Sequence, residues 1–356
     1  MIDRMRPSHV RAVLEREFLA ADQGIHTPVM LWGPPGVGKS RIAADVAAAH
    51  GVPLVDIRLS QMEPTDLRGI PFREGDRVEW SVPSLLPDAQ RHGQAGILFL
   101  DEITSAPPTV TAAAYQLILD RRLGDYRVPA GWAIFSAGNR YGDRGVTYVM
   151  PAPLANRFTH YEIEPHLDDW VQWAHAAGID WRVIAFLRFR PDLLFEFDSA
   201  RNPVAFPSPR SWEYAHRALL KFADAPHLRL ESLQACVGPA CGVELLAFLD
   251  QMDAMPDVDA IARGTSMEMP EGLDVQYGVA TALVRKAQRL SSDAEAQVMM
   301  RNILRYAREF PQQELGVMLV TDMHRTLGQP LYGLPEFQEW AQSVSDLLSF
   351  DRSRPA

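Results

Sequence analysis

Two patterns of apolar residues divide the chain. In its first half, short apolar runs are separated by helical stretches such as 109–120, TVTAAAYQLILD. The runs lie at 28–32, 54–59, 96–102, 132–139 and, with a weaker period-two alternation, at 159–165. The run at 96–102, GILFLDE, is apolar until its last two residues, as in strands buried on both faces of a parallel sheet. Alternating strands and helices predict an α/β fold with a doubly wound parallel sheet.

The second half has the periodicity of helices. Beyond the polar, proline-containing stretch 198–210, apolar residues recur at the spacing of one helical face. One such set is Met299, Ile303, Tyr306 and Phe310, and another is Val275, Val279, Leu283 and Leu290. A chain of 356 residues also exceeds one ordinary core. We therefore expect several parts: an α/β core at 1–195 with an inserted hairpin at 59–87, a linker at 196–210, and an all-helical lid or C-terminal domain at 211–356.

A glycine-rich loop joins the first apolar run to the first helix of the core. Its sequence, GPPGVGKS, has the pattern G-x-x-x-x-G-K-S of a P-loop. Glycines let backbone N–H groups turn toward phosphates, and the helix N-terminus adds partial positive charge. We expect Lys39 to reach the β- and γ-phosphates of ATP and Ser40 to bind Mg²⁺. The expected nucleotide-binding residues are Gly33, Pro34, Pro35, Gly36, Val37, Gly38, Lys39, Ser40 and Arg41.

Polar side chains end two of the predicted core strands. Asp101 ends the buried run at 96–102, where a carboxylate can hold the metal through water, and Glu102 beside it can deprotonate the attacking water. Asn139 ends the run at 132–139, where an amide can position the same water. Alone, an Asp-Glu pair is usually part of a solvated loop, and Asn is a common turn residue. Together with the P-loop, the three residues predict an ATP hydrolysis site.

These residues and four further motifs resemble the AAA+ ATPases and, among them, the MoxR family. The motifs are EPTDLRG at 63–69, GNRYGDRG at 138–145, PLANRF at 153–158 and SPRSWE at 208–213. The resemblance covers roughly residues 25–215. It implies a P-loop NTPase sheet sandwiched by helices and followed by a helical lid. Family members often have Asn-Pro after the strand that ends at Asn139, whereas this chain has Asn139-Arg140, which indicates a divergent branch.

The resemblance assigns a role to Arg157. In AAA+ proteins the arginine at this position is a finger that reaches the γ-phosphate of the neighbouring subunit, so that hydrolysis depends on assembly. A guanidinium suits this role because it can neutralise charge on the transferring phosphoryl group in a fork geometry. The alternative is a local pair with Asp143 or Glu162.

Arg210 resembles the second sensor of the family. It stands where the helical lid begins and could report loss of the γ-phosphate to the lid. The alternative is an arginine on the solvated face at a helix N-terminus. Arg140, Arg144 and Arg201 are other candidates for contacts with the nucleotide.

The stretch 59–87 is long for a connection between strand and helix, and long ordered loops tend to be functional. Its segment REGDR contains the Gly-Asp of a hairpin tip, with Val78 and Trp80 alternating behind it. The resemblance implies an insert that faces the central surface of a ring. The alternative is a hairpin packed on its own domain, with Trp80 as a buried anchor.

Composition and charge narrow the class of protein. Hydrophobic residues make up 47% of the chain and charged residues 22%, as in globular proteins, and no apolar run approaches the ~20 residues of a membrane span. Residues 1–16 are charged throughout and lack a signal-peptide core, so we expect a cytoplasmic protein. The net charge of −10 makes nucleic acid an unlikely partner. The two cysteines, Cys236 and Cys241, are expected to be reduced core thiols rather than zinc ligands.

The combined interpretation is a Mg²⁺-ATP hydrolase that assembles into a ring, as the MoxR resemblance implies, and the ring size that we expect is a hexamer. The resemblance implies chaperone-like remodelling of a protein client, with a partner that carries a von Willebrand factor A domain. One alternative is a nucleic-acid motor or helicase loader, which shares every ATP-site residue. Another is an assembly switch that binds ATP and hydrolyses little, which Glu102 argues against.

Overall fold

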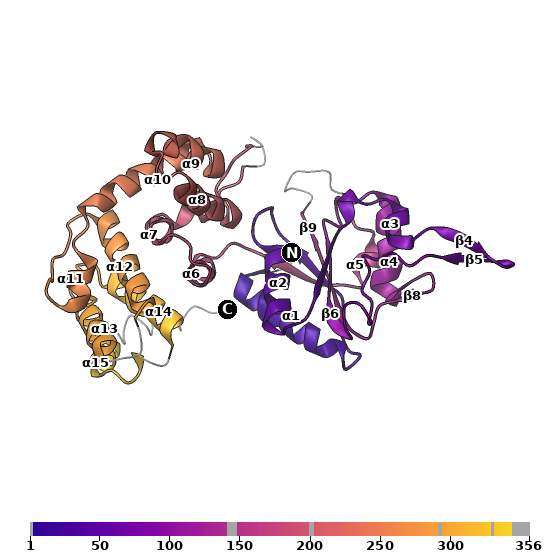
Figure 1. Cartoon of the computed structure of the whole chain (residues 1–356), viewed down its shortest axis with the longest axis horizontal. Coiled ribbons are helices and arrows are strands. Elements are labelled where there is room, and N and C mark those ends of the chain that lie inside the picture. Colours follow the sequence, from indigo (N-terminus) through magenta and orange to yellow (C-terminus); the bar gives the residue numbers. More distant parts are fainter. Residues whose placement is uncertain (1–2, 141–147, 199–202, 291–293, 329–330, 344–356) are drawn as a thin grey trace. The chain divides into compact units, whose positions relative to one another are not determined.

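The computed structural model describes residues 3–140, 148–198, 203–290, 294–328 and 331–343. The chain separates into two compact units. An α/β unit comprises Met1–His166 and Asp198–Asn202, and a helical unit comprises Leu167–Phe197 and Pro203–Ala356. Figure 1 labels the elements of both units.

The α/β unit is built on a six-stranded sheet in which every adjacent pair of strands is parallel. In order across the sheet, the strands are β1 (Arg4–Met5), β10 (Thr159–Ile163), β2 (Val29–Trp32), β9 (Gly131–Gly138), β6 (Ala95–Asp101) and β3 (Leu54–Arg58). The five longer strands coincide with the five apolar runs, which confirms the predicted parallel α/β fold. The short edge strand β1 was not predicted.

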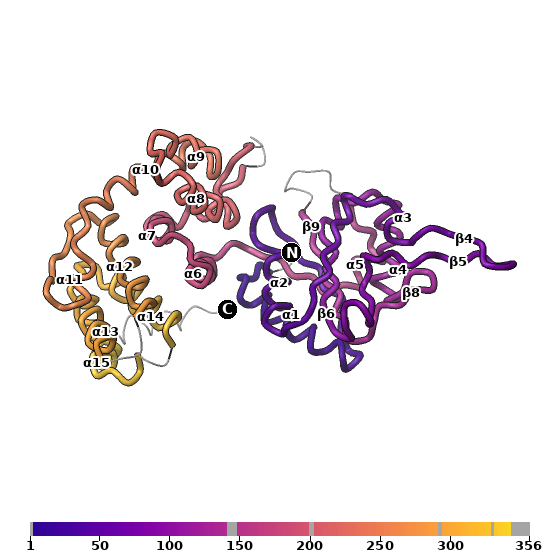
Figure 2. The backbone as a smooth tube through the Cα atoms, in the orientation of Figure 1, coloured from indigo at the N-terminus to yellow at the C-terminus, as the bar shows by residue number. Residues whose placement is uncertain are grey.

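Helices cover both faces of this sheet. They are α1 (Pro7–Ala21), α2 (Lys39–Ala49), α3 (Pro64–Arg68), α4 (Pro108–Asp120) and α5 (Ala152–Ala155), with a short 3-10 turn η1 at Leu59–Gln61. The tube in Figure 2 shows α1 and α2 on one face and α3, α4 and α5 on the other. The predicted sandwich of a sheet between helices is therefore present.

Strands β6 and β9 are neighbouring interior strands whose side chains are almost all buried. Every residue of β9 is buried, as are Gly96–Leu100 of β6. The ring of Trp132 on β9 is fully buried and covers Gly96 on β6 so closely that a Cβ at this glycine would lie 2.7 Å from the ring. Trp132 Nε1 donates a hydrogen bond to the carbonyl of Gly93, at 3.0 Å. A glycine is therefore required where the two strands pack around this indole.

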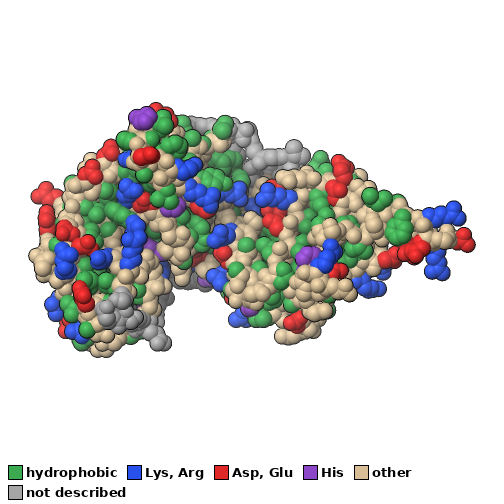
Figure 3. Space-filling view, in the orientation of Figure 1, with side chains coloured by type: hydrophobic (Ala, Val, Ile, Leu, Met, Phe, Trp, Pro, Cys, Tyr) green, Lys and Arg blue, Asp and Glu red, His purple; other side chains and the backbone are tan. Residues whose placement is uncertain are grey.

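The inserted hairpin is formed as predicted, but it does not pack on its own domain. Strands β4 (Pro71–Glu74) and β5 (Arg77–Trp80) pair antiparallel around Gly75, and every residue of both is exposed. The hairpin extends away from the sheet and carries charges of both signs at its tip (Figures 1 and 3). The Trp80 residue is 41% exposed to solvent. The alternative in which Trp80 is a buried anchor is therefore wrong, because no element among the described residues covers this face of the hairpin.

A second small hairpin follows α4. Strands β7 (Arg122–Leu123) and β8 (Tyr126–Arg127) pair antiparallel. Arg121, which has a left-handed backbone, donates to the carbonyls of Pro129 and Trp132. These bonds fix the connection that leads into β9.

The helical unit contains ten α-helices among its described residues. They are α6 (Leu167–Ala176), α7 (Trp181–Phe189), α8 (Pro209–Lys221), α9 (Arg229–Val237), α10 (Pro239–Gln251), α11 (Val258–Arg263), α12 (Leu273–Gln288), α13 (Ala294–Tyr306), α14 (Gln313–Leu327) and α15 (Pro335–Ser343). Three 3-10 turns join them: η2 (Pro191–Leu194), η3 (Pro226–Leu228) and η4 (Met252–Ala254). This confirms the predicted helical character of the second half.

The two periodic sets of apolar residues lie largely where the helical pattern placed them. Val275, Val279 and Leu283 are buried on α12, and Ile303 and Tyr306 are buried on α13. The last member of each set, Leu290 or Phe310, follows the end of its helix.

The boundary between the units differs from the one drawn from the sequence. Val171 on α6 and Phe186 on α7 belong to the same hydrophobic cluster as Trp212 on α8 and Leu245 on α10. A boundary after residue 195 would cut through this cluster. The sequence offered no sign of it, because α6 follows the last strand as a crossover helix of the sheet would.

Two further features of the helical unit are a pair of thiols and a cavity. Cys236 and Cys241 are both free, and burial raises their pKa values, to about 12 for Cys241.

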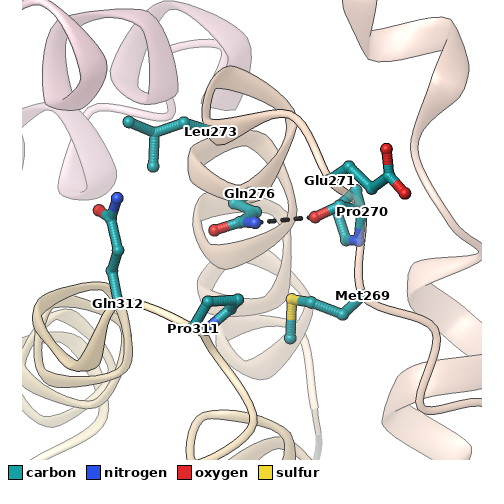
Figure 4. Close-up of a pocket in the computed structure, with 7 residues that line it drawn as sticks. All are labelled: Met269, Pro270, Glu271, Leu273, Gln276, Pro311 and Gln312. Atoms are coloured by element: carbon teal, nitrogen blue, oxygen red, sulfur yellow. Dashed lines mark hydrogen bonds between the residues drawn. The ribbon is translucent and has the colours of Figure 1, made fainter.

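The cavity, of about 410 Å³, is lined by Met269, Pro270, Glu271, Leu273, Gln276, Pro311 and Gln312. Figure 4 shows the Gln276 amide, which donates to the carbonyl of Pro270 at 2.8 Å and ties this loop to α12. None of the described helices is long and apolar enough to cross a membrane.

A buried ion cluster joins three helices of the helical unit. Arg188 on α7 binds Asp168 on α6 and Asp322 on α14, each at 2.6 Å. The side chains of Arg188 and Asp322 are only 9% and 6% exposed. Removing one partner of a buried pair leaves an uncompensated charge.

We expect Arg188→Met to destabilise the helical unit by about 3–5 kcal/mol, because the Asp322 carboxylate would be buried without its partner. Urea denaturation followed by far-UV circular dichroism measures this. The matched control is Arg217→Met, which breaks a solvent-exposed pair with Glu213 one helical turn away and should cost at most about 1 kcal/mol. Equal effects of the two substitutions would contradict the assignment of Arg188 as the ion that joins these helices.

Candidate nucleotide-binding site

The order of the strands brings the predicted site residues to one edge of the sheet. Strands β2, β9 and β6 are neighbours and parallel, so their carboxyl ends face the same way. The P-loop follows β2, Asn139 follows β9, and Asp101 ends β6. In open parallel sheets, ligands bind outside the carboxyl ends of the strands.

The P-loop has the backbone that a phosphate cradle needs. Gly33, Gly36 and Gly38 have φ values of 155°, 83° and 97°, which side chains rarely adopt. A Cβ at Gly33 would also lie 3.0 Å from the carbonyl oxygen of Ile163 on β10. Helix α2 begins at Lys39, directly after Gly38. The first backbone N–H groups of this helix therefore face the loop and are available to an anion.

The Lys39 ammonium lies at the centre of the site. It donates to the carbonyls of Gly33 and Pro34, at 2.6 and 3.1 Å, and to the side-chain oxygen of Asn139 at 3.0 Å. The structure thus brings together two residues that are 100 positions apart in the sequence. A phosphate oxygen is a stronger acceptor for an ammonium than a carbonyl, because it carries charge. The contacts of Lys39 mark where such an oxygen would bind.

The two acidic residues at the end of β6 lie in different surroundings. Burial raises the pKa of Asp101, although the Glu102 N–H donates to its carboxylate at 2.8 Å and Lys39 attracts it. Glu102 has a left-handed backbone, with φ at 57°. Residues other than glycine rarely adopt this conformation, and it is common at functional sites. The Ser60 hydroxyl, after β3, donates to one oxygen of the Glu102 carboxylate.

Asn139 is held from the side by Thr104. The Thr104 hydroxyl accepts from the backbone N–H of Asn139 at 3.2 Å and bonds its carbonyl at 3.3 Å. Thr104 is 4% exposed, and a Cβ at Gly138 would lie 2.8 Å from its side chain. These contacts fix the backbone from which the Asn139 amide reaches Lys39.

Arg157 follows α5 and is exposed. Within the described part of the chain, its side chain makes no hydrogen bond or ion pair. Glu162, one of its two possible local partners, instead binds Arg4 at 2.9 Å and also Arg140. The other possible partner, Asp143, lies outside the described residues. The finger role of Arg157 stays a prediction.

Arg210 is exposed in the first turn of α8, in the helical unit. Its neighbour Ser208 caps this helix by accepting from the N–H of Ser211 at 3.2 Å. Two of the rival arginines, Arg144 and Arg201, lie outside the described residues, and Arg140 is committed at least in part to Glu162. The second-sensor role of Arg210 also stays a prediction.

Sequence reasoning missed Ser60 and Thr104. Ser60 hydrogen-bonds to Glu102 and Thr104 hydrogen-bonds to Asn139, and in each case the two residues follow different strands. No spacing in the sequence reveals such a bond, because it depends on the order of the strands. Among the residues that the structure describes, no cluster of three or more His, Cys, Asp and Glu could hold a metal ion. The roles of Ser40 and Asp101 as magnesium ligands stay predictions.

Comparisons with known proteins agree with this geometry. Residues 28–149 match the family model described as the AAA domain of the dynein-related subfamily. Protein NorQ of Paracoccus denitrificans is 36% identical over 97 residues, which cover 27% of this chain and 35% of NorQ. Midasin of Giardia intestinalis is 29% identical over 145 residues, which cover 38% of this chain and 3% of midasin. The chain thus spans about a third or less of the length of these curated relatives.

Among solved structures, a variant of RuvB from Thermotoga maritima superposes with a TM-score of 0.38 at 16% identity, over 83% of this chain and 92% of RuvB.

The match to the AAA-domain family model includes the P-loop, Asp101, Glu102 and Asn139, and it ends before Arg157. The matched segment therefore contains the P-loop and the carboxyl ends of β2, β9 and β6.

We expect Thr104→Val to lower the rate of ATP hydrolysis by about tenfold while ATP binding is retained, because a buried N–H of Asn139 loses its acceptor. Steady-state phosphate release and binding of a fluorescent ATP analogue measure the two quantities. Thr104→Ser keeps the hydroxyl and is the control, which should hydrolyse ATP at nearly the wild-type rate. A Thr104→Val protein with unchanged turnover would show that this bond does not position Asn139.

Proposed function

We propose that this chain, whose residues 28–149 form an AAA domain of the dynein-related subfamily, is a Mg²⁺-dependent ATPase of the MoxR type that works as a ring. One observation carries the proposal. The Lys39 ammonium joins the P-loop carbonyls to Asn139 at the sheet edge where Asp101 and Glu102 end β6. This arrangement suits phosphoryl transfer, in which catalysis is mainly positioning and charge stabilisation.

Each residue has a distinct task in hydrolysis. Lys39 exchanges its carbonyl acceptors for oxygens of the β- and γ-phosphates and offsets their charge. Glu102 accepts a proton from the attacking water, and the Asn139 amide orients that water. The Ser60 hydroxyl holds one oxygen of Glu102 and leaves the other to face the water.

The residues present fit a magnesium ion beside the nucleotide. Ser40 lies in the first turn of α2, directly after Lys39, and Asp101 ends β6. These oxygen donors are of the kind that Mg²⁺ prefers when nucleotide phosphates supply further ligands. When bound, the ion would neutralise charge that develops between the β- and γ-phosphates.

The exposure of Arg157 supports a role toward a neighbouring subunit. Its guanidinium makes no side-chain bond among the described residues, and Glu162 already pairs with Arg4 and Arg140. An arginine held available on the surface can reach a γ-phosphate bound by an adjacent copy of the chain. We propose a homo-oligomeric ring, of six subunits by family resemblance, in which Arg157 acts in trans and Arg210 acts as the second sensor.

The wider role is proposed from the similarity to NorQ, a MoxR-family protein. It is chaperone-like remodelling of a protein client in the cytoplasm, with a von Willebrand factor A domain protein as partner. The exposed hairpin supports a protein client over nucleic acid. Val78 and Trp80 present apolar surface, and Arg73 and Arg77 alternate with acidic residues rather than forming a basic patch.

We expect Glu102→Gln to bind ATP and Mg²⁺ with nearly unchanged affinity and to hydrolyse ATP about 10²–10⁴-fold more slowly, because the water loses its base. Phosphate release gives the rate, and equilibrium binding of a fluorescent analogue gives the affinity. Lys39→Ala is the comparison and should lose binding as well. Near-normal turnover by Glu102→Gln would show that another group takes the proton.

We expect Arg157→Ala to bind ATP normally but to hydrolyse it at least about a hundredfold more slowly, because arginine fingers contribute about 10³–10⁵ in rate in well-studied GTPases. Rings that mix Arg157→Ala with Glu102→Gln should regain activity, although each variant alone is inactive. In the mixed ring, an intact Arg157 faces an intact Glu102 at some interfaces.

Two tags on co-expressed chains allow isolation of the mixed rings. The control is Arg16→Ala, an exposed arginine on α1, which should leave turnover unchanged. Mixed rings that stay inactive would mean that Arg157 acts within its own chain or is structural.

A further inference from the structure

A chain of hydrogen bonds runs from the strand that leads into the P-loop to the helix that precedes Arg157. Trp32, the last residue of β2, donates from its indole Nε1 to Nδ1 of His160 on β10, at 2.9 Å. The other ring nitrogen of His160, Nε2, lies 2.7 Å from the carbonyl of Ala155, the last residue of α5. The Trp32 and His160 rings also stack, with centroids 6.0 Å apart and planes 20° apart.

These partners determine the tautomer of His160. Indole N–H is a donor only and a backbone carbonyl is an acceptor only. Nδ1 must therefore be unprotonated to accept from Trp32, and Nε2 must carry the proton to donate to Ala155. The neutral ring satisfies both bonds, and no other arrangement of its protons does. His160 thus forms a bridge that connects Trp32 to the Ala155 carbonyl through two hydrogen bonds, and Nδ1 is always the acceptor and Nε2 always the donor.

The first end of the bridge is attached to the nucleotide site. Trp32 directly precedes Gly33, whose carbonyl accepts from Lys39 at 2.6 Å. Gly33 also packs on β10, since a Cβ there would lie 3.0 Å from the Ile163 carbonyl oxygen. When phosphates replace the carbonyls around Lys39, Gly33 loses a hydrogen bond. A displacement at Gly33 would reach Trp32 through one peptide bond and β10 through direct contact.

The second end of the bridge is attached to Arg157. Ala155 precedes Arg157 by two residues, and its carbonyl also accepts from the N–H of Phe158 at 3.2 Å. Helix α5 is only four residues long, so it offers little rigidity of its own. Leu154 and Phe158 pack in the hydrophobic core beside sheet residues, and the bond to His160 adds a polar link to β10. The direction in which the chain presents Arg157 depends on this link.

We propose that His160 is a positioning residue that couples the P-loop of one subunit to the Arg157 of the same subunit, so that a subunit presents its arginine to the neighbour according to its own nucleotide. This inference rests on the proposed action of Arg157 in trans, and it adds a route by which the occupancy of one site sets the rate at the next. Trp32, His160 and the Ala155 carbonyl are the parts of that route.

The test uses rings in which hydrolysis occurs at one kind of interface only. The acceptor subunit carries Arg157→Ala and keeps its own pocket intact. The donor subunit supplies Arg157 and carries either Glu102→Gln, which is expected to bind ATP, or Lys39→Ala, which is expected to remain empty. Neither donor can hydrolyse ATP itself. The measured turnover therefore reports how well the donor presents Arg157.

Coupling predicts that donors with bound ATP work better. We expect rings with Glu102→Gln donors to hydrolyse ATP at least about fivefold faster than rings with Lys39→Ala donors, the lower end of usual coupling between sites. Adding Trp32→Phe to the donor removes the indole N–H and keeps an aromatic ring. It should lower the Glu102→Gln donor to the level of the Lys39→Ala donor and leave the Lys39→Ala donor unchanged.

A merely structural role gives a different pattern. If Trp32 and His160 only stabilise the fold, Trp32→Phe should lower both donors by the same factor, and that result would overturn the coupling. Equal activity with both donors would overturn it as well and leave the action of Arg157 in trans intact. Failure of both donors to restore any activity would instead contradict the proposed trans arginine.

A second set of variants, at His160, does not depend on Lys39→Ala or Trp32→Phe. It tests the coupling even if Lys39→Ala subunits do not enter the ring or if Trp32→Phe weakens ATP binding. An asparagine oxygen can replace Nδ1 and retain the Trp32 bond, whereas a glutamine nitrogen can replace Nε2 and retain the Ala155 bond. A relay needs both bonds, so His160→Asn and His160→Gln in the Glu102→Gln donor should both lower turnover at least about fivefold. ATP binding by these donors, measured with a fluorescent analogue, should stay within about twofold of the parent. Full activity of either variant would show that its missing bond carries no signal.

Discussion

The site depends on the position of one ammonium group. Lys39 is the first residue of α2, yet it bonds backwards to the loop carbonyls of Gly33 and Pro34 and sideways to Asn139. This geometry requires β2 and β9 to be adjacent and parallel, and it requires glycines where the loop turns. The parallel pairing of β2 with β9 meets the first requirement, and the buried interior strands β9 and β6 hold the sheet together beside it. The hydrophobic core therefore serves the chemistry by holding the ends of three strands at one edge.

Arg157 lies on the opposite side of β2 from Asn139. Strand β10 lies on the other side of β2 from β9, and Arg157 lies on the surface between the short helix α5 and this strand. Asn139 contacts Lys39 directly, whereas a chain of hydrogen bonds through Trp32, His160 and Ala155 leads from the P-loop strand toward Arg157. In the proposed mechanism, the β9 side of β2 carries the chemistry within one chain and the β10 side carries the interaction with a neighbouring subunit.

Local patterns predicted much of this structure. The apolar runs gave the five longer strands because buried parallel strands must be apolar on both faces, and the P-loop spacing gave the loop and the start of α2. Contacts between distant segments were not predictable. Ser60, Thr104 and His160 are ordinary polar residues in the sequence, and their importance follows from strand order alone. The sequence left the burial of Trp80 open, because nothing in a short hairpin reveals whether another element covers it. Helices α6 and α7 were assigned to the wrong unit for a related reason, since their partners α8 and α10 lie far along the chain.

The central claim is that a complete catalytic site needs two subunits. The most direct measurement is ATP turnover per subunit over a roughly hundredfold dilution, with oligomer size and nucleotide binding followed at each concentration. The account predicts that turnover per subunit falls in step with loss of the oligomer, because Arg157 must come from a neighbouring chain. Binding of ATP to each chain should persist, because the P-loop is complete within one chain. Constant turnover in dissociated subunits would contradict the account.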